Sequence, residues 1–132
     1  MAATFELEIA TPERLLVKEL VTEAQLPAAG GEIGVLPGHA PLLSELGIGA
    51  LSYVVNGERH RLAVAGGVIE VQAETCRVLA MAAEKPSEID SARAQAAEKR
   101  AMERLATMKE NLDYARALNA LNRAQARLKV AQ

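Results

Sequence analysis

The residues best suited to chemistry are arginines, arranged in two rows near the end of the chain. Both rows have the same spacing of seven and then four residues: Arg93, Arg100 and Arg104, followed by Arg116, Arg123 and Arg127. On a helix this spacing places each row on one face. Arginine is a forked, permanently charged donor that suits phosphate or carboxylate. Arginine rows are also found on solvated outer faces, so the residues alone leave both interpretations open.

The segment that positions these arginines, residues 87–132, is predicted to be helical. It contains no glycine or proline, although the chain has nine glycines and five prolines. Ala, Glu, Lys, Arg, Leu and Met, the strongest helix formers, dominate it. Ser87 and Asp90 have the spacing of a capping box, which predicts a helix start. Asn111 as a helix stop and Asp113 as an N-cap predict two helices folded as an antiparallel hairpin.

Each predicted helix also carries an apolar stripe with the three-four spacing of a buried face. The first stripe comprises Ala94, Ala97, Ala101, Leu105, Met108 and Leu112. The second comprises Tyr114, Leu118, Leu121, Ala124 and Leu128. We therefore expect the two helices to bury these residues.

The first part of the chain is predicted to form short strands. Residues 5–9 alternate between apolar and polar, and an extended region over 15–26 is expected to stop at Pro27. Asn56-Gly57 between two β-like runs is a strong hairpin signal. Further strands are expected at 68–71 and 76–81. This spacing predicts an α+β protein, with an antiparallel β-sandwich or flattened barrel over 1–85 and the helical hairpin over 86–132.

The charge is divided between these two parts. The chain has a net charge of −2, but residues 1–86 carry −5 and residues 87–132 carry +3. A basic arm on an acidic body can lie on its own body or on another acidic surface. Nucleic acid is a weaker interpretation, because such interfaces usually combine a basic domain with stacking aromatics. The whole chain has only three aromatic residues.

Little in the sequence suggests catalysis. There is no glycine-rich loop followed by Lys-Ser or Lys-Thr, and no cluster of cysteines or histidines with metal-ligand spacing. Cys76 is expected to be a small core side chain and His60 a surface strand residue. The stretch 30–43 is too irregular for a plain strand, and it is expected to close one end of the sandwich. We interpret the chain as a subunit or regulator rather than an enzyme acting alone.

Three motifs resemble those of one family, the epsilon subunit of bacterial F-type ATP synthase. They are the loop Gly31-Glu-Ile-Gly-Val-Leu-Pro-Gly-His-Ala-Pro-Leu-Leu43, the strand motif Gly66-Gly-Val-Ile-Glu-Val71, and Ile89-Asp-Ser-Ala-Arg-Ala94 at the start of the first helix. The resemblance covers nearly the whole chain in order. It implies a non-catalytic subunit of the rotor's central stalk, which couples proton flow to ATP synthesis. No metal or required cofactor is implied.

The resemblance also implies partners and a location. The sandwich would contact the gamma subunit and the membrane-embedded ring of c subunits through its loop, at Glu32, Gly34, Gly38 and His39. The protein would be peripheral, on the cytoplasmic side of the cell inner membrane, and held there only through the complex.

In this family the hairpin can fold on the sandwich or extend along gamma, where it impedes ATP hydrolysis. The extended arm would meet the beta subunit, and alpha, through Arg116, Arg123 and Arg127. In some members ATP binds the folded hairpin. The matching positions are Glu84, Ile89, Asp90, Arg93, Arg100, Arg123 and Arg127. The same residues could instead serve packing and the beta contact, and a free-standing interaction module is the rival function.

Overall fold

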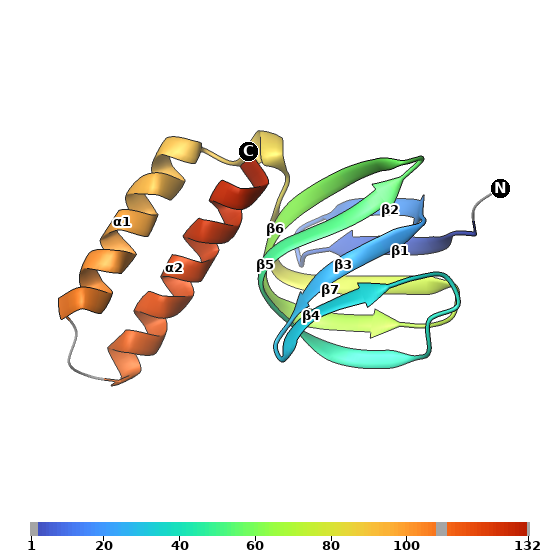
Figure 1. Ribbon diagram of the computed structural model, residues 1–132, viewed down its shortest axis with the longest axis horizontal. Coiled ribbons are helices and arrows are strands. Elements are labelled where there is room, and N and C mark those ends of the chain that lie inside the picture. Colours follow the sequence, from blue (N-terminus) through green and yellow to red (C-terminus); the bar gives the residue numbers. More distant parts are fainter. Residues whose placement is uncertain (1–2, 108–110, 132) are drawn as a thin grey trace.

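The computed structural model describes residues 3–107 and 111–131 (Figure 1). A single seven-stranded sheet forms the first part, and two long helices form the second. The strands are β1 (Phe5–Ala10), β2 (Leu15–Val21), β3 (Glu23–Ala28), β4 (Gly31–Val35), β5 (Leu42–Val55), β6 (Glu58–Val71) and β7 (Thr75–Glu84). The helices are the 3-10 turn η1 (Pro86–Glu88), α1 (Ser91–Thr107) and α2 (Asn111–Ala131).

The sheet curls round on itself to enclose a core. Its strand order is β2-β1-β7-β6-β5-β3-β4, so β2 and β3 lie far apart in the sheet although only Thr22 separates them in the chain. Thr22 N–H donates to Val54 O at 3.0 Å and joins this corner to β5. The sandwich or flattened-barrel prediction is confirmed. It was wrong in one respect, because β1 and β7 pair in parallel while the other neighbours are antiparallel.

The alternating residues of the strands fill the space inside the curled sheet. In β1 the buried side chains are Phe5, Leu7 and Ile9, as the alternation predicted. They pack in one cluster with residues from all six remaining strands, including Leu51, Leu62 and Val78. Cys76 lies in the same cluster, and burial raises its pKa to about 12. Apart from Phe5, Tyr53 and Cys76, the core is aliphatic, as a chain with few aromatics requires.

The two longest strands carry the predicted hairpin. Asn56 and Gly57 connect β5 to β6 with φ values of 50° and 83°, the left-handed pair that a two-residue type I′ turn needs. Further along β6, Gly67 has φ +135°, and a Cβ there would lie 2.0 Å from Leu79 O. Only glycine allows β6 to approach β7 so closely at this bend.

Two predictions about breaks in the strands were wrong. Pro27 does not end the second extended region; it lies inside β3 and pairs with Glu32 of β4. It is tolerated because the pairing of β3 with β5 is interrupted between Gln25 and Ala28, so no ladder bond to β5 is required there. The stretch 30–43 is also more regular than expected. It supplies β4 and the start of β5, and only residues 36–41 are irregular.

The helices pack as a pair beside the sheet. In Figure 1, α2 lies between α1 and the strands, and its main partners besides α1 are β5 and β6. The predicted hairpin is confirmed, but its signals were partly misassigned. Ser87 forms no capping box with Asp90; Asp90 is itself the cap of α1, accepting a 3.0 Å hydrogen bond from Arg93 N–H. Asn111 begins α2, so it is neither a helix stop nor followed by an N-cap at Asp113.

The apolar stripes are only partly buried. Ala94, Ala101 and Ala124 are buried as expected, whereas Tyr114 and Leu118 are 48% and 37% exposed. The predicted stripe missed Ala117, Ala126 and Val130, which are buried. The reason is that α2 has two partners, α1 and the sheet, so a single stripe cannot describe its contacts. Met108 lies outside the described residues, as does the side chain of Leu112.

Candidate functional site

A pocket of about 340 Å³ lies where the sandwich, the linker and both helices meet. It is lined by Glu84, Glu88, Asp90, Arg93, Ala94, Ala97, Arg100 and Arg127. Its volume is within the range of small-molecule sites, roughly 300–1,000 Å³. Four separate elements contribute to it: the end of β7, the turn η1, the face of α1 and the face of α2.

The local sequence explains why these side chains converge. Asp90 caps α1 through the N–H of Arg93, and Ala94 N–H donates to Asp90 O at 3.0 Å. From this fixed start, Arg93, Ala97 and Arg100 follow at helical spacing on one side of α1. Arg127 reaches the pocket from α2. Its Nε lies 2.5 Å from Oε1 of Glu84, the last residue of β7.

The charges inside the pocket leave arginines available for an anion. Arg127 is paired with Glu84, and Glu88 is paired with Arg14 from outside the lining. Within the described part of the chain, neither Arg93 nor Arg100 forms a salt bridge. Two unpaired guanidinium groups on one helix face can donate to phosphate oxygens in the bidentate manner typical of arginine.

The structure brings together five of the seven residues predicted for ATP: Glu84, Asp90, Arg93, Arg100 and Arg127. Arg123 lines an adjacent small hollow against the sheet, which Glu84 and Arg127 also line. Ile89 does not line the pocket, because it packs on the apolar cluster of Ala63, Ala126 and Val130.

Sequence reasoning missed Glu88. Its carboxylate accepts a hydrogen bond from Lys85 N–H at 2.8 Å, three residues back. The spacing Lys85-x-x-Glu88 before a helix was the available signal. The hydrogen bond from Lys85 N–H, followed by that from Arg14, holds the pKa of Glu88 below its usual range.

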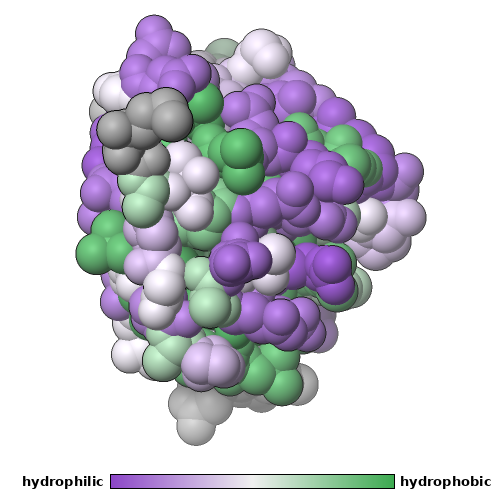
Figure 2. All heavy atoms as spheres, turned by 90° about the vertical axis from the view of Figure 1, so that its right-hand side faces the viewer, coloured by the Kyte–Doolittle hydropathy of each residue, from purple (hydrophilic) through white to green (hydrophobic). Residues whose placement is uncertain are grey.

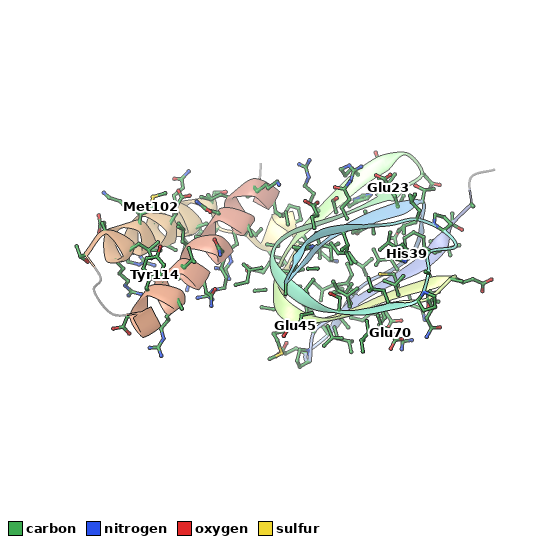
Figure 3. The ribbon with its side chains drawn as sticks, turned by 60° about the horizontal axis from the view of Figure 1, so that its bottom comes forward. Glu23, His39, Glu45, Glu70, Met102 and Tyr114 are labelled. Atoms are coloured by element: carbon green, nitrogen blue, oxygen red, sulfur yellow. The ribbon has the colours of Figure 1, made fainter. Side chains whose placement is uncertain are left out.

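The predicted loop residues are spread along the sandwich: His39 lies at the end away from the helices, whereas Glu32 lies beside the β3–β4 turn, next to Ala28, which lines a hollow with Asn119 and Asn122 of α2. Glu32 and Gly34 are exposed on β4, and Figure 3 places His39 at the end opposite Met102 and Tyr114. His39 N–H donates to Leu36 O at 3.1 Å, which closes a turn with Pro37 second and Gly38 third. Gly38 has φ +80°, as position three of a type II turn requires.

This turn is held by a backbone hydrogen bond and has an exposed leucine on either side. Gly38 N–H donates to Ala73 O at 3.0 Å, which ties it to the connection between β6 and β7. Leu36 and Leu43 on either side are 59% and 72% exposed. Figure 2 shows this end of the sandwich, where apolar patches stand among hydrophilic side chains. Exposed apolar side chains that form a contiguous patch are typical of a protein–protein contact.

The arginines predicted to meet the beta subunit differ in exposure while the hairpin is folded. Arg116 is exposed, whereas Arg123 and Arg127 face the sheet and the pocket and are half-buried.

His60 is an exposed residue of β6, as expected, and its ring stacks on Tyr53 with centroids 5.2 Å apart. Among the described residues, no group of three or more His, Cys, Asp or Glu could hold a metal ion.

Comparison with known proteins identifies the family. Residues 4–86 match the model of the ATP synthase delta/epsilon chain β-sandwich domain, and residues 87–132 match that of its long α-helix domain. The chain belongs to the ATP synthase delta/epsilon chain family.

Relatives named ATP synthase epsilon chain match over most of their length. The chain is 53% identical to the one from Solibacter usitatus, over 99% of this chain and 98% of the relative. It is 47% identical to the one from Nitratidesulfovibrio vulgaris, over 98% of this chain and 97% of the relative. The epsilon-subunit resemblance is thus confirmed, and with it the prediction of an accessory subunit rather than an enzyme acting alone.

The fold is shared with more distant chains. A chain of the Euglena gracilis mitochondrial ATP synthase OSCP/F1/c-ring structure has a TM-score of 0.83 at 22% identity, over 99% of this chain and 82% of that one. A chain of the Tetrahymena thermophila central stalk and c-ring structure has a TM-score of 0.69 at 16% identity, over 99% and 98%. None of the described helices is long and apolar enough to cross a membrane.

Proposed function

We propose that this protein is a rotor subunit in the central stalk of a proton-translocating F-type ATP synthase, with a helical hairpin that regulates ATP hydrolysis. The observation that carries the regulatory part is the composition of the pocket. Its lining comes from β7, the linker, α1 and α2 together, so the pocket exists only while the hairpin is folded on the sandwich. A ligand bound there stabilises the folded state and opposes extension.

ATP is the ligand that we propose for this pocket. The volume suits a nucleotide, and Arg93 and Arg100 supply positive charge for a triphosphate. Arg127 is already oriented by Glu84 at the pocket wall. The ligand would be regulatory: Arg93, Arg100 and Arg127 would bind and orient it, and no nucleophile or metal site accompanies them among the described residues.

The energetics favour a switch. The apolar contact between hairpin and sandwich is small: Ala126, Val130 and Ile89 pack on Ala63 and Ala50. Burying a valine or isoleucine side chain contributes only about 1.5–3 kcal/mol, and the ordering of the arm offsets part of that. A ligand at a hundred times its dissociation constant adds about 2.7 kcal/mol to the folded state. That amount is enough to shift a nearly balanced equilibrium.

Two surfaces of the sandwich are proposed to hold the rotor partners. The turn of Leu36, Gly38 and His39 would contact the ring of c subunits. An apolar row on the outside of the sheet, exposed except for the half-buried Ala10, crosses β6, β7, β1 and β2 and would pack on gamma. The row is formed by Val68, Leu79, Ala10 and Leu15, which are cross-strand partners in the sheet.

The extended state would use arginines that contact the sandwich while the hairpin is folded. Opening the hairpin breaks the contact of Arg127 with Glu84 and frees Arg123 from the sheet. Both would then join Arg116 as a basic helix face for the beta subunit and alpha. Through this complex the protein would be a peripheral protein on the cytoplasmic side of the inner membrane.

The decisive experiment removes the hairpin from the assembled enzyme. Deletion of residues 87–132 is expected to raise ATP hydrolysis while proton-driven ATP synthesis is largely retained. The control is the full chain reconstituted in the same preparation. Unchanged hydrolysis would contradict regulation by the hairpin, and a loss of assembly with gamma would show that the hairpin serves attachment instead.

A further inference from the structure

An ion pair joins the turn between β1 and β2 to the linker before α1. Arg14 Nη2 lies 2.7 Å from Oε2 of Glu88 and donates a 2.9 Å hydrogen bond to Oε1. Oε1 also accepts the 2.8 Å hydrogen bond from Lys85 N–H. Both oxygens of Glu88 are thus held by groups that do not line the pocket, although Glu88 itself does.

Glu88 is the first of three consecutive residues that are each fixed by a different contact. Ile89 packs into the apolar cluster between the sheet and α2. Asp90 caps α1. The start of α1 is therefore joined to the sandwich by one ion pair and one apolar contact, and the Asp90 cap fixes the first turn of the helix to this linker. Of these, the ion pair alone depends on a charged side chain from the sandwich.

The charge of Glu88 gives the pair a second consequence. The pocket lining contains three acids and three arginines, and Glu84 already pairs with Arg127. Without Arg14, Glu88 would keep only the bond from Lys85 N–H to Oε1, and its Oε2 could turn toward Arg93 or Arg100 and compete with an anion. Arg14 thus removes a competing acid from the pocket without touching the ligand.

We propose that Arg14 is a positioning residue: through Glu88 it fastens the linker to the sandwich, keeps the hairpin docked and leaves the arginines of α1 free for an anion. The fastening itself stands on the contacts above, and its effect on a ligand rests on the proposed nucleotide function. Arg14 lies 74 residues before Glu88 and outside the helical segment, so it is absent from the motif positions discussed above.

The effect expected of the Arg14–Glu88 ion pair, which we call the clasp, is modest. The two side chains are 46% and 34% exposed, and exposed ion pairs change an equilibrium by roughly two- to fivefold. Such a factor is small for the stability of the sandwich. It is meaningful for a hairpin whose docked and released states are nearly balanced.

The test is amide hydrogen exchange on the full chain without nucleotide, comparing wild type with Arg14→Gln, Glu88→Gln and the double variant. The amides of Lys85 and Ala94 report the clasp and the start of α1. Each single variant is expected to speed their exchange by about two- to fivefold. The double variant is expected to exchange no faster than the faster single one, because both changes remove the same contact.

Arg77→Gln is the matched control, since Arg77 lies 3.9 Å from Glu8 on the sandwich and is near the start of β7, at the opposite end of that strand from the linker. It should leave both amides unchanged. Exchange in Arg14→Gln equal to that in Arg77→Gln, or single-variant effects that multiply in the double variant, would overturn the proposal. ATP titration of the same proteins is a separate readout. If wild type fails to bind ATP, the nucleotide proposal falls while amide exchange still judges the clasp.

Discussion

At the scale of single residues, the pocket is defined by which arginines are paired and which are not. Arg127 is held by Glu84, so its guanidinium has a fixed place in the folded hairpin. Arg93 and Arg100 have no salt-bridge partner among the described residues, yet both line the pocket. These unpaired arginines at a concave surface are the basis of the anion site that we propose.

Arg100 offers a direct comparison with its neighbour Arg104. Arg100→Gln is expected to weaken ATP binding by roughly tenfold or more, because a hydrogen bond to a charged group contributes about 1.5–3 kcal/mol. Arg104 is exposed and does not line the pocket, so Arg104→Gln should have little effect. Chemical-shift titration of both variants with ATP measures the difference. Equal weakening by the two changes would indicate a general charge effect and contradict the assigned site.

Glu88 makes the linker sensitive to acid. The hydrogen bond from Lys85 N–H and the contact with Arg14 lower its pKa in the folded protein. A lowered pKa means that this carboxylate contributes its full stabilisation of the docked linker at pH values above its pKa in the unfolded chain. The contribution is lost as the pH falls through its pKa in the folded protein. NMR titration of the Glu88 carboxyl should confirm a lowered pKa that rises only partly in Arg14→Gln, since the Lys85 bond remains. A pKa in the usual glutamate range would contradict the contact.

At the scale of elements, the bend of β6 against β7 depends on a missing side chain. Gly67 combines a left-handed φ with a backbone oxygen where its Cβ would lie, whereas Gly57 has φ +83° but open space. A substitution at Gly57 therefore measures the free-energy cost of a side chain at positive φ alone, whereas one at Gly67 adds the cost of a steric clash.

Gly67→Ala is expected to destabilise the fold by about 1–3 kcal/mol more than Gly57→Ala, because it adds overpacking to an unfavourable φ. Urea unfolding of the two variants gives the comparison, with the denaturant slope as a check that both still unfold in one step. Equal free energies of unfolding would mean that β6 can move away from Leu79 without cost, and that the glycine is needed only for its φ.

At the scale of the whole molecule, a stable sandwich carries an arm with a small docking contact. The core of the sheet involves residues from all seven strands, while the arm is attached by a satellite cluster, one ion pair at the pocket and one at the linker. Regions with few buried apolar contacts open at lower free energy than the core. The arm should therefore be released long before the sandwich unfolds.

Val130→Ala tests this difference in stability. Val130 is 2% exposed in the docking cluster, and its truncation should weaken docking by about 1–3 kcal/mol. Amide exchange is expected to rise in α1 and α2 and to stay unchanged in β5 and β6, with ATP restoring protection. Leu118→Ala, at an exposed position of α2, is the control. A parallel rise in the strands would show that arm and sandwich open as one unit.

Local sequence determined a large share of this protein. Asn56-Gly57 specified the β5–β6 hairpin, the absence of glycine and proline after residue 86 specified the helices, and helical spacing brought Asp90, Arg93 and Arg100 to one face. These features depend on the backbone preferences of neighbouring residues, which a sequence displays directly. Of the residues that the family resemblance implied for ATP, these three share the pocket through local spacing, whereas Glu84 and Arg127 reach it from β7 and α2.

Only the tertiary structure decided the contacts between distant segments. The parallel pairing of β1 with β7, the packing of Ile89 on Ala63 and Val130 and the ion pair of Arg14 with Glu88 all join residues far apart in the chain. Likewise, α2 buries Ala126 and Val130 rather than Tyr114 and Leu118, because it lies between two partners. Such choices depend on which surfaces meet after folding, and no local pattern records them.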